Sequence, residues 1–429
     1  MKIYSENILT RENRSSLLRR PSTQKSDTIN IAKDICIAVK QRGDDAVRDY
    51  SKKFDHAEGQ TIRVPKEELE AAKEQLSSEF IDALNTAVKN IRAFHESQFN
   101  KTQRITTMNG VDCWRESRPL ERVGLYVPAG SAPLPSTVLM LGIPAMLAGC
   151  SRIVLCSPPK TDGTVDPMVL AVATMIGIQE VYAVGGAQAI AAMAYGTESI
   201  PKVDKIFGPG NRYVTAAKQF VSTDPEGAAI DLLAGPSEVL VLADETANPD
   251  VVAYDLISQA EHDPDAQTVL VTTSKSLATE VLRVLPQRTA EFERNKIIES
   301  SLEQSYIVIA DSIESAVRFS NDYAPEHLII NMQHAESIIP SIINAGSVFV
   351  GSFAPVTAGD YASGTNHTLP TGGTARWASG VSLDSFLKNI TFQSITQSGL
   401  ERLAPALTVF ASVEGLQAHA RAVTSRLSK

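Results

Sequence analysis

The strongest constraint on the fold of this chain is a regular alternation of short apolar runs with amphipathic stretches between residues 126 and 237. The apolar runs lack a two-residue alternation, which predicts strands buried on both faces. Strand–helix units of this kind form a parallel sheet covered by helices. Strands are predicted at 122–127, 153–156, 181–184 and 206–207, and helices at 139–148, 165–176, 187–195 and 213–221.

The same alternation resumes after residue 238 and predicts a second parallel sheet. Its strands are predicted at 239–243, 268–272, 307–310, 328–332 and 347–350, and its helices at 251–261, 277–285 and 313–319. The pattern predicts an α/β protein with two doubly wound parallel sheets and smaller terminal pieces. Residues 1–24 are expected to form an irregular arm, 66–99 a long helical stretch, and the chain from about 385 to 426 mostly helix.

Composition narrows the class of partner. The 429 residues carry a net charge of −9, which argues against nucleic acid or an anionic membrane surface as the main partner. The longest apolar run, 138–148, is interrupted by Gly142 and Pro144 and is too short to cross a bilayer. Residues 1–10 show no apolar targeting segment, and the four cysteines show no CxxC spacing. We therefore expect a cytoplasmic protein with reduced thiols that acts on a small molecule.

One polar stretch, 357–373, has almost nothing to bury. Gly, Ser, Thr and Asn fill much of it, and Asp360 and His367 lie seven positions apart. No apolar period runs through it, so it is predicted to be a long loop, of the kind that is often functional. Asp360 and His367 could provide a metal or proton-transfer site. A plain surface loop with an incidental acid and imidazole is the alternative.

Three further segments place a histidine beside a carboxylate or amide. Gln259 and His262 lie three positions apart at the end of a predicted helix, where His262 could bind a metal or interact with the helix dipole. The adjacent Glu326 and His327 could transfer protons, provided that the backbone is irregular there, or could be structural.

Glu414 and His419 lie five positions apart in the predicted C-terminal helices. They converge only if Gly415 interrupts the helix, and otherwise belong to a surface helix.

Two glycine segments, 185–188 and 208–211, follow predicted strands, where ligands bind in parallel sheets. The segments 234–237 and 324–327 precede strands, and that rule does not place them in a site. The chain contains no GxGxxG sequence after a strand and no GxxxxGK[ST] loop.

Taken together, these segments resemble the histidinol dehydrogenase family over nearly the whole chain. The matching segments are VGLYVP at 123–128, GGAQA at 185–189, FGPGN at 207–211, AGPSE at 234–238, QAEH at 259–262, YAPEH at 323–327, GTNH at 364–367, and EGL with the following histidine at 414–419. The resemblance implies an NAD-dependent, four-electron oxidation of L-histidinol to L-histidine through the aldehyde, the last two steps of histidine biosynthesis. It also implies one Zn²⁺ per subunit that holds the substrate.

The resemblance assigns roles to individual positions. Glu326 and His327 are the implied acid–base pair, with His327 taking the alcohol proton and Glu326 activating water. The implied zinc ligands are Gln259, His262, Asp360 and His419. These four residues, His327, Ser237, His367 and Glu414 are the implied substrate contacts. The implied NAD contacts are Tyr126, Gln188 and Asn211.

The resemblance further implies a homodimer with shared active sites and two Rossmann-like domains. The expected division is a 1–24 arm, a larger α/β domain of 25–125 and 238–380, an inserted domain of 126–237, and a helical tail of 381–429.

Three rival functions use the same residues: a zinc hydrolase, a zinc-dependent binding protein without turnover, and a relative that oxidises another small polar alcohol. The intact segments at 364–367 and 414–419 favour the imidazole substrate.

Overall fold

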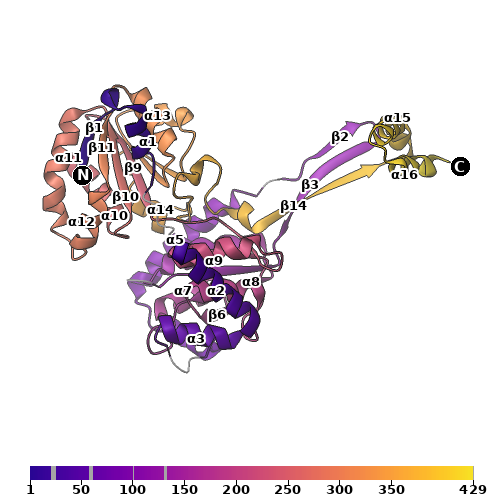
Figure 1. The fold of residues 1–429 in the computed structure, drawn as a ribbon, viewed down its shortest axis with the longest axis horizontal. Helices are drawn as coiled ribbons and strands as arrows, with labels where there is room; N and C mark the ends of the chain where they lie inside the picture. Colours follow the sequence, from indigo (N-terminus) through magenta and orange to yellow (C-terminus); the bar gives the residue numbers. More distant parts are fainter. Residues whose placement is uncertain (21–25, 58–60, 100, 130–132, 429) are drawn as a thin grey trace.

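The structure is a computed structural model that describes residues 1–20, 26–57, 61–99, 101–129 and 133–428. It contains two parallel sheets, each covered by helices on both faces, and a projecting antiparallel arm (Figure 1). The predicted fold class is therefore confirmed. No described helix combines the length and apolar character needed to cross a membrane.

The first sheet has five parallel strands in the order β6-β5-β4-β7-β8. They span Glu180–Ala183 (β6), Arg152–Ser157 (β5), Arg122–Tyr126 (β4), Lys205–Phe207 (β7) and Ala229–Ile230 (β8). Its covering helices are α2 (Ser26–Arg42), α3 (Asp44–Phe54), α4 (Lys66–Lys73), α5 (Ser78–Glu96), α6 (Pro135–Ala148), α7 (Pro167–Met175), α8 (Gly186–Tyr195) and α9 (Arg212–Thr223). Two apolar cores result, one shared with α4–α7 and one with α2, α3, α8 and α9.

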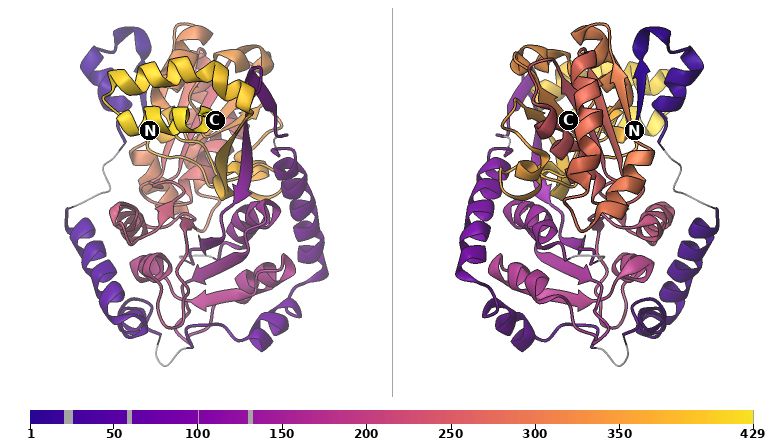
Figure 2. Two further views of the ribbon diagram at one scale, coloured as in Figure 1. Left: turned by 90° about the vertical axis from the view of Figure 1, so that its right-hand side faces the viewer. Right: turned by 90° about the vertical axis from the view of Figure 1, so that its left-hand side faces the viewer.

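The placement of α2–α5 differs from the division predicted from sequence. Residues 25–125 were expected to join the second sheet, yet α2–α5 pack on the five-stranded sheet (Figure 2). Ile35 and Val39 of α2, for example, are buried in the same core as Ile190 of α8. The stretch 66–99 is also two helices rather than one. Amphipathic periodicity shows that a helix has an apolar face, but it does not show which sheet receives that face.

The second sheet has six parallel strands in the order β1-β11-β10-β9-β12-β13. They span Lys2–Ser5 (β1), Tyr306–Ile309 (β11), Gln267–Thr272 (β10), Glu238–Ala243 (β9), His327–Asn331 (β12) and Ser347–Val350 (β13). One face is covered by α10 (Pro249–Ala260), α11 (Lys275–Thr289), α12 (Asn295–Glu303) and α14 (Val356–Tyr361), and the other by α1 (Arg11–Leu17) and α13 (Ile313–Tyr323).

The N-terminal segment is more regular than predicted. β1 pairs in parallel with β11, and Leu17 and Leu18 pack against the core beneath α13. The expected irregular arm is therefore wrong for most of its length. The first strand was missed because its partner lies about three hundred residues further along the chain, as the pairing of Ile3 with Ile307 shows.

The C-terminal piece begins with a strand that the sequence analysis assigned to helix. β14 (Leu387–Ile395) pairs antiparallel with β3 (Val111–Pro119), which also pairs with β2 (Arg104–Met108). The β-branched and aromatic run at Ile390–Phe392 favours a strand and was the available signal. The arm carries α15 (Gln397–Val413) and α16 (Gln417–Leu427) away from the two sheets (Figure 1). Four short 3₁₀ segments complete the described structure: Glu6–Ile8, Ala335–Ser341, Thr374–Arg376 and Leu383–Phe386.

Candidate active site

Glu326 and His327 lie together at the amino end of β12, and both are buried. Neighbours on a strand point to opposite faces, but Glu326 precedes the strand and Ala324 has a φ of 52°. This irregular backbone brings Glu326 Oε2 to 3.4 Å from His327 Nδ1. The local irregularity that an acid–imidazole pair required is therefore present.

The peptide groups of Glu238 hold both side chains. Its N–H donates to Glu326 Oε2 at 2.8 Å, and its carbonyl lies 3.0 Å from His327 Nδ1. The hydrogen-bond network therefore assigns the proton of a neutral His327 to Nδ1. His327 Nε2 is buried and has no hydrogen-bond partner among the described residues, with Asp360 Oδ1 3.6 Å away. Nε2 is thus the ring nitrogen available to a reacting group.

Opposite charges dominate the electrostatics of this cluster. Burial would lower the pKa of His327, but the Glu326 and Asp360 carboxylates overcome it and raise this pKa to about 10. Burial would likewise raise the pKa of Asp360, but the charges of His327, His367 and His262 lower it. Asp360 is therefore a carboxylate surrounded by three imidazoles.

Asp360 lies in the short helix α14, so the predicted loop of 357–373 is helical at its start. His367 folds back on it: Nδ1 lies 3.0 Å from the Asp360 carbonyl oxygen, and Nε2 lies 3.3 Å from the Thr137 hydroxyl. Burial lowers the pKa of His367. Thr137 is in α6 of the five-stranded half, so His367 connects the two halves of the molecule.

Gln259 and His262 are located at the end of α10, as predicted. Gln259 is buried in the last turn, and His262 follows the helix with an exposed side chain. His262 is near enough to Asp360 to influence its pKa. Ser237 precedes β9 at the same edge of the sheet and is partly buried.

Glu414 caps the end of α15 and His419 lies in α16, and these two helices are at the tip of the arm, far from α14 (Figure 1). Gly415 has a φ of 72° and separates α15 from α16, so the helix interruption that convergence of the two side chains requires is present. Both side chains are exposed. Within one chain the described residues form no group of three or more His, Cys, Asp or Glu that could hold a metal ion. The expected set of Gln259, His262, Asp360 and His419 is therefore not assembled by one subunit.

The donor types nevertheless suit zinc. His262 and Asp360 provide an imidazole and a carboxylate, which Zn²⁺ prefers, from two elements brought together by the fold. Beside Asp360, the buried Nε2 of His327 has no hydrogen-bond partner among the described residues, so a polar group is open to a bound ligand there.

The three implied NAD contacts share the carboxyl edge of the five-stranded sheet. β4 and β7 are neighbours from which the strand order runs in opposite directions, a position where α/β sheets bind ligands. Tyr126 ends β4, and its hydroxyl accepts a hydrogen bond from the Gly186 N–H at 2.9 Å. Asn211 is exposed and caps α9. Gln188 is buried and donates to Asp55 Oδ2 at 3.4 Å.

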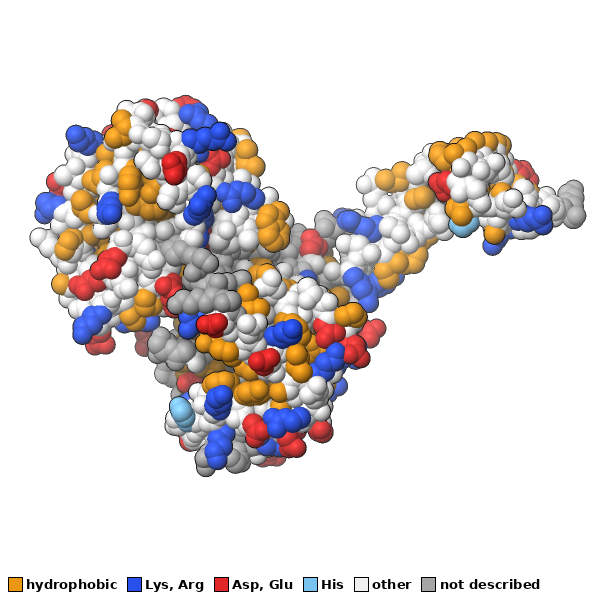
Figure 3. Space-filling view, in the orientation of Figure 1, with side chains coloured by type: hydrophobic (Ala, Val, Ile, Leu, Met, Phe, Trp, Pro, Cys, Tyr) orange, Lys and Arg blue, Asp and Glu red, His pale blue; other side chains and the backbone are white. Residues whose placement is uncertain are grey.

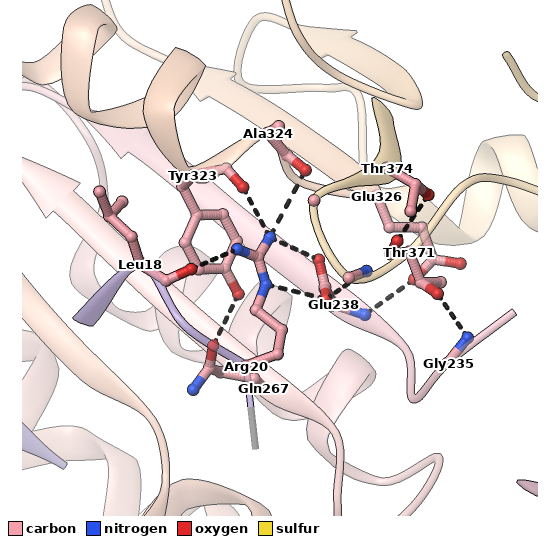
Figure 4. Close-up of polar contacts among 12 residues, drawn as sticks. Leu18, Arg20, Gly235, Glu238, Gln267, Tyr323, Ala324, Glu326, Thr371 and Thr374 are labelled. Carbon is pink, nitrogen blue, oxygen red and sulfur yellow. Dashed lines mark hydrogen bonds and ion pairs between the residues drawn. The ribbon is translucent and has the colours of Figure 1, made fainter. Parts of the chain in front are cut away.

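Sequence reasoning missed one part of this site, the buried contact between Arg20 and Glu238 (Figure 4). The available signal was an acidic residue directly before the apolar run 239–243, because a carboxylate at a buried strand position needs a partner.

Two parallel sheets, one with a ligand-binding switch point and one with a buried acid–base pair at its edge, are typical of an α/β enzyme. The chain belongs to the histidinol dehydrogenase family, because the sequence model of that family matches residues 18–427. It is 50% identical over 422 residues to a histidinol dehydrogenase from Vibrio parahaemolyticus, covering 98% of this chain and 97% of the relative. A Bacteroides fragilis relative of the same name is 50% identical over 415 residues, with 97% and 96% covered.

The fold agrees with a solved structure of the same family. The crystal structure of histidinol dehydrogenase from Elizabethkingia anophelis matches with a TM-score of 0.96 and 49% identity, covering 100% of this chain and 98% of that one.

Proposed function

We propose that the protein oxidises L-histidinol to L-histidine through the aldehyde and reduces two NAD⁺, the last two steps of histidine biosynthesis. The observation that carries the proposal is a pair of hydrogen bonds at Glu238, whose N–H donates to Glu326 and whose carbonyl accepts from His327. These bonds leave the buried Nε2 of His327 without a hydrogen-bond partner among the described residues, 3.6 Å from Asp360 Oδ1. A proton acceptor and a water-activating carboxylate are the groups that the two oxidations need.

In the first oxidation, His327 Nε2 takes the hydroxyl proton while a hydride passes from the carbinol carbon to NAD⁺. Water then adds to the aldehyde, with Glu326 accepting a water proton. His327 releases the first proton to solvent. The anionic hydrate then passes the remaining hydrogen of that carbon as hydride to another NAD⁺, and its remaining hydroxyl proton leaves through His327 to give the carboxylate. A neutral His327 is required, and a divalent cation on Asp360 would oppose the imidazolium charge that the two carboxylates favour.

One Zn²⁺ per subunit would be held by Gln259, His262 and Asp360 of one chain and by His419 of the other. When bound, it supplies a Lewis acid that holds the imidazole and amine of the substrate. Ser237, His367 and Glu414 would complete the substrate site, and Tyr126, Gln188 and Asn211 the NAD site. Metal analysis of the purified protein should give about one zinc per chain, and the His262→Asn variant should contain less.

A homodimer is supported by the surface of the arm. Apolar side chains are exposed along α15 and the turn after it, which is costly in water and typical of a covered surface (Figure 3). These residues are Val409, Phe410, Val413 and Leu416. A partner that receives this surface would also receive Glu414 and His419. All four cysteines are free, which fits the proposed cytoplasmic location.

The test is NADH absorbance after NAD⁺ is added to enzyme and L-histidinol. Two NADH should form per histidinol, with histidine as the final product. A zinc hydrolase would form none, a binding protein would bind histidinol without reducing NAD⁺, and a relative for another alcohol would reduce NAD⁺ only with that alcohol. Any of these results would refute the proposal.

A further inference from the structure

Arg20 and Glu238 form a buried ion pair behind the acid–base pair (Figure 4). Arg20 Nε donates to Glu238 Oε1 and Nη2 donates to Oε2, both at 2.9 Å. The two side chains are only 12% and 2% exposed. Burial raises the pKa of Glu238, and Arg20 acts in the opposite direction by stabilising the carboxylate. A paired arrangement of this kind fixes both side chains, because separating them would leave an unpaired charge in the interior.

The Arg20 guanidinium is itself anchored on several sides. Nη1 donates to the Leu18 carbonyl at 3.0 Å, and Nη2 donates to the Tyr323 carbonyl at 2.7 Å. Its central carbon lies 3.4 Å from the centre of the Tyr323 ring. A planar group with five donors can make these contacts together, whereas a lysine ammonium cannot. Glu238 is therefore tied to the segment that leads into Glu326.

Glu238 has two separate roles in this arrangement. Its side chain is held by Arg20 and by the Gly372 N–H, which donates to Oε1 at 2.8 Å. Its peptide groups hold Glu326 and His327. Rotation of the Glu238 backbone would therefore move the acid and the base together.

We propose that Arg20 and Glu238 are positioning residues, which set the orientation of Glu326 and His327 through the Glu238 peptide groups. Neither side chain needs to touch the substrate in this role. The proposal deepens the proposed function and rests on it for the kinetic measurements. Its geometric basis is independent of the substrate.

The kinetic test compares Arg20→Ala with Arg14→Ala. Arg14 comes from the same N-terminal segment and forms an ion pair with Asp322 at 2.7 Å, but does not contact Glu238. Misplacing reacting groups by about 1 Å can cost about 100-fold in rate, so we expect kcat of Arg20→Ala to fall about 10- to 100-fold. The KM for histidinol should change less, and Arg14→Ala should retain the parental kcat. Added guanidinium chloride, at concentrations that leave the parent folded, should restore part of the Arg20→Ala activity.

A purely structural role would lower the melting temperature but leave kcat per folded site unchanged, and that result would overturn the proposal. Glu238→Gln provides a second, nearly isosteric variant if Arg20→Ala does not fold. It should also lose kcat, because it replaces an acceptor oxygen by an NH₂ group. Parental kcat in folded Glu238→Gln would equally overturn the proposal.

A crystal structure of a folded variant tests the positioning role independently of the proposed function. In a folded variant we expect the Glu238 N to Glu326 Oε2 separation to exceed hydrogen-bond range, about 3.5 Å. Unchanged contacts to Glu326 and His327 would overturn the positioning role, whether or not the enzyme turns over. An inactive parent enzyme would instead refute the proposed function alone.

Discussion

The two parallel sheets present opposite edges to the candidate site. In the five-stranded sheet, Tyr126 and Asn211 lie at the carboxyl ends of β4 and β7, where ligands bind in α/β folds. In the six-stranded sheet, Glu238 and His327 begin β9 and β12, so the proposed chemistry lies at the amino ends. The carboxyl edge of that sheet instead lines a separate cavity of about 570 Å³. The five-stranded sheet therefore contributes its carboxyl edge to the candidate site, and the six-stranded sheet contributes its amino edge.

A chain of contacts shows why both edges are needed. Thr137 follows the carboxyl end of β4 and contacts His367, which contacts the Asp360 backbone, and Asp360 lies beside His327. The carboxyl edge of one sheet thus faces the amino edge of the other. A dinucleotide on the first edge would be brought to an acid–base pair on the second. The rule that ligands bind at the carboxyl ends of parallel strands describes the dinucleotide edge, but not the acid–base pair at the amino ends of the six-stranded sheet.

The sharpest test of this comparison is His327→Asn. Loss of the base should slow both oxidations, and removal of general-base catalysis costs about 10²- to 10⁴-fold in kcat. His334→Asn is the matched control, since His334 is exposed near the carboxyl edge of the same sheet. It should retain parental kcat. An equal loss in both variants would show that the two edges are not functionally distinct.

Glu326→Gln should separate the two steps at the amino edge. Only the second oxidation consumes water, so loss of the activating carboxylate should slow it by about 10²-fold or more while the first proceeds. The NADH yield per histidinol should fall from two toward one, with the aldehyde accumulating. Direct assay of histidinal is the check. Parental histidinal oxidation would show that the role of Glu326 is misassigned.

Asn211→Asp tests the carboxyl edge of the five-stranded sheet. Asp is as good an N-cap as Asn, so α9 should remain folded. The added carboxylate should repel an anionic dinucleotide and raise KM for NAD⁺ about 10-fold, equivalent to about 1.4 kcal/mol. The KM for histidinol should stay near its parental value. If the histidinol KM rises and the NAD⁺ KM does not, Asn211 belongs to the other ligand.

Besides the edges of the two sheets, the arm is expected to contribute to the candidate site by reaching a second subunit. His262→Asn and His419→Asn should each be inactive alone. In a mixed dimer one site carries both substitutions and the other carries none, so random exchange should restore about a quarter of parental activity. Sites built within one chain would give no restored activity. Mass spectrometry of the mixed dimers is the control for exchange.

The smallest expected effect concerns stability. Burial raises the pKa of Asp255 on α10 to about 7, so the folded protein binds this proton more tightly than the unfolded chain. Stability should therefore fall as pH rises from the unfolded value of about 4 to about 7. Asp255→Asn should be more stable than the parent above that window, by about 1–4 kcal/mol, and nearly equal below it.

Thermal melts at several pH values measure this difference in stability. Asp55→Asn in the five-stranded half is the comparison, because the pKa of Asp55 is raised only to about 6. The gain in stability of Asp55→Asn at high pH should therefore be smaller than that of Asp255→Asn. A gain for Asp255→Asn that does not change with pH would contradict the assigned cause.

Periodicity predicted four of the five described strands of the first sheet and five of the six of the second, and it missed β8 and β1. β13 was predicted at its observed bounds, and β9 began one residue earlier than predicted. Buried parallel strands and their helices carry this signal within a single run of residues. The antiparallel arm was missed because β2 and β14 are largely exposed and β14 pairs with β3 across a long separation, as Ile390 and Glu116 do.

The sequence by itself determined the two-sheet α/β class, the family, and the residue types expected at the site. Glu326 and His327 were recognisable because they are adjacent in the chain. Only the tertiary structure decided that Arg20 meets Glu238 across 218 residues, and that the backbone N–H and C=O of this one residue hold the acid and the base. The physical reason is that the apolar periodicity and the secondary-structure propensity of a segment depend only on residues that are near one another in the chain. The pairing of buried charges, by contrast, is decided by which segments pack together.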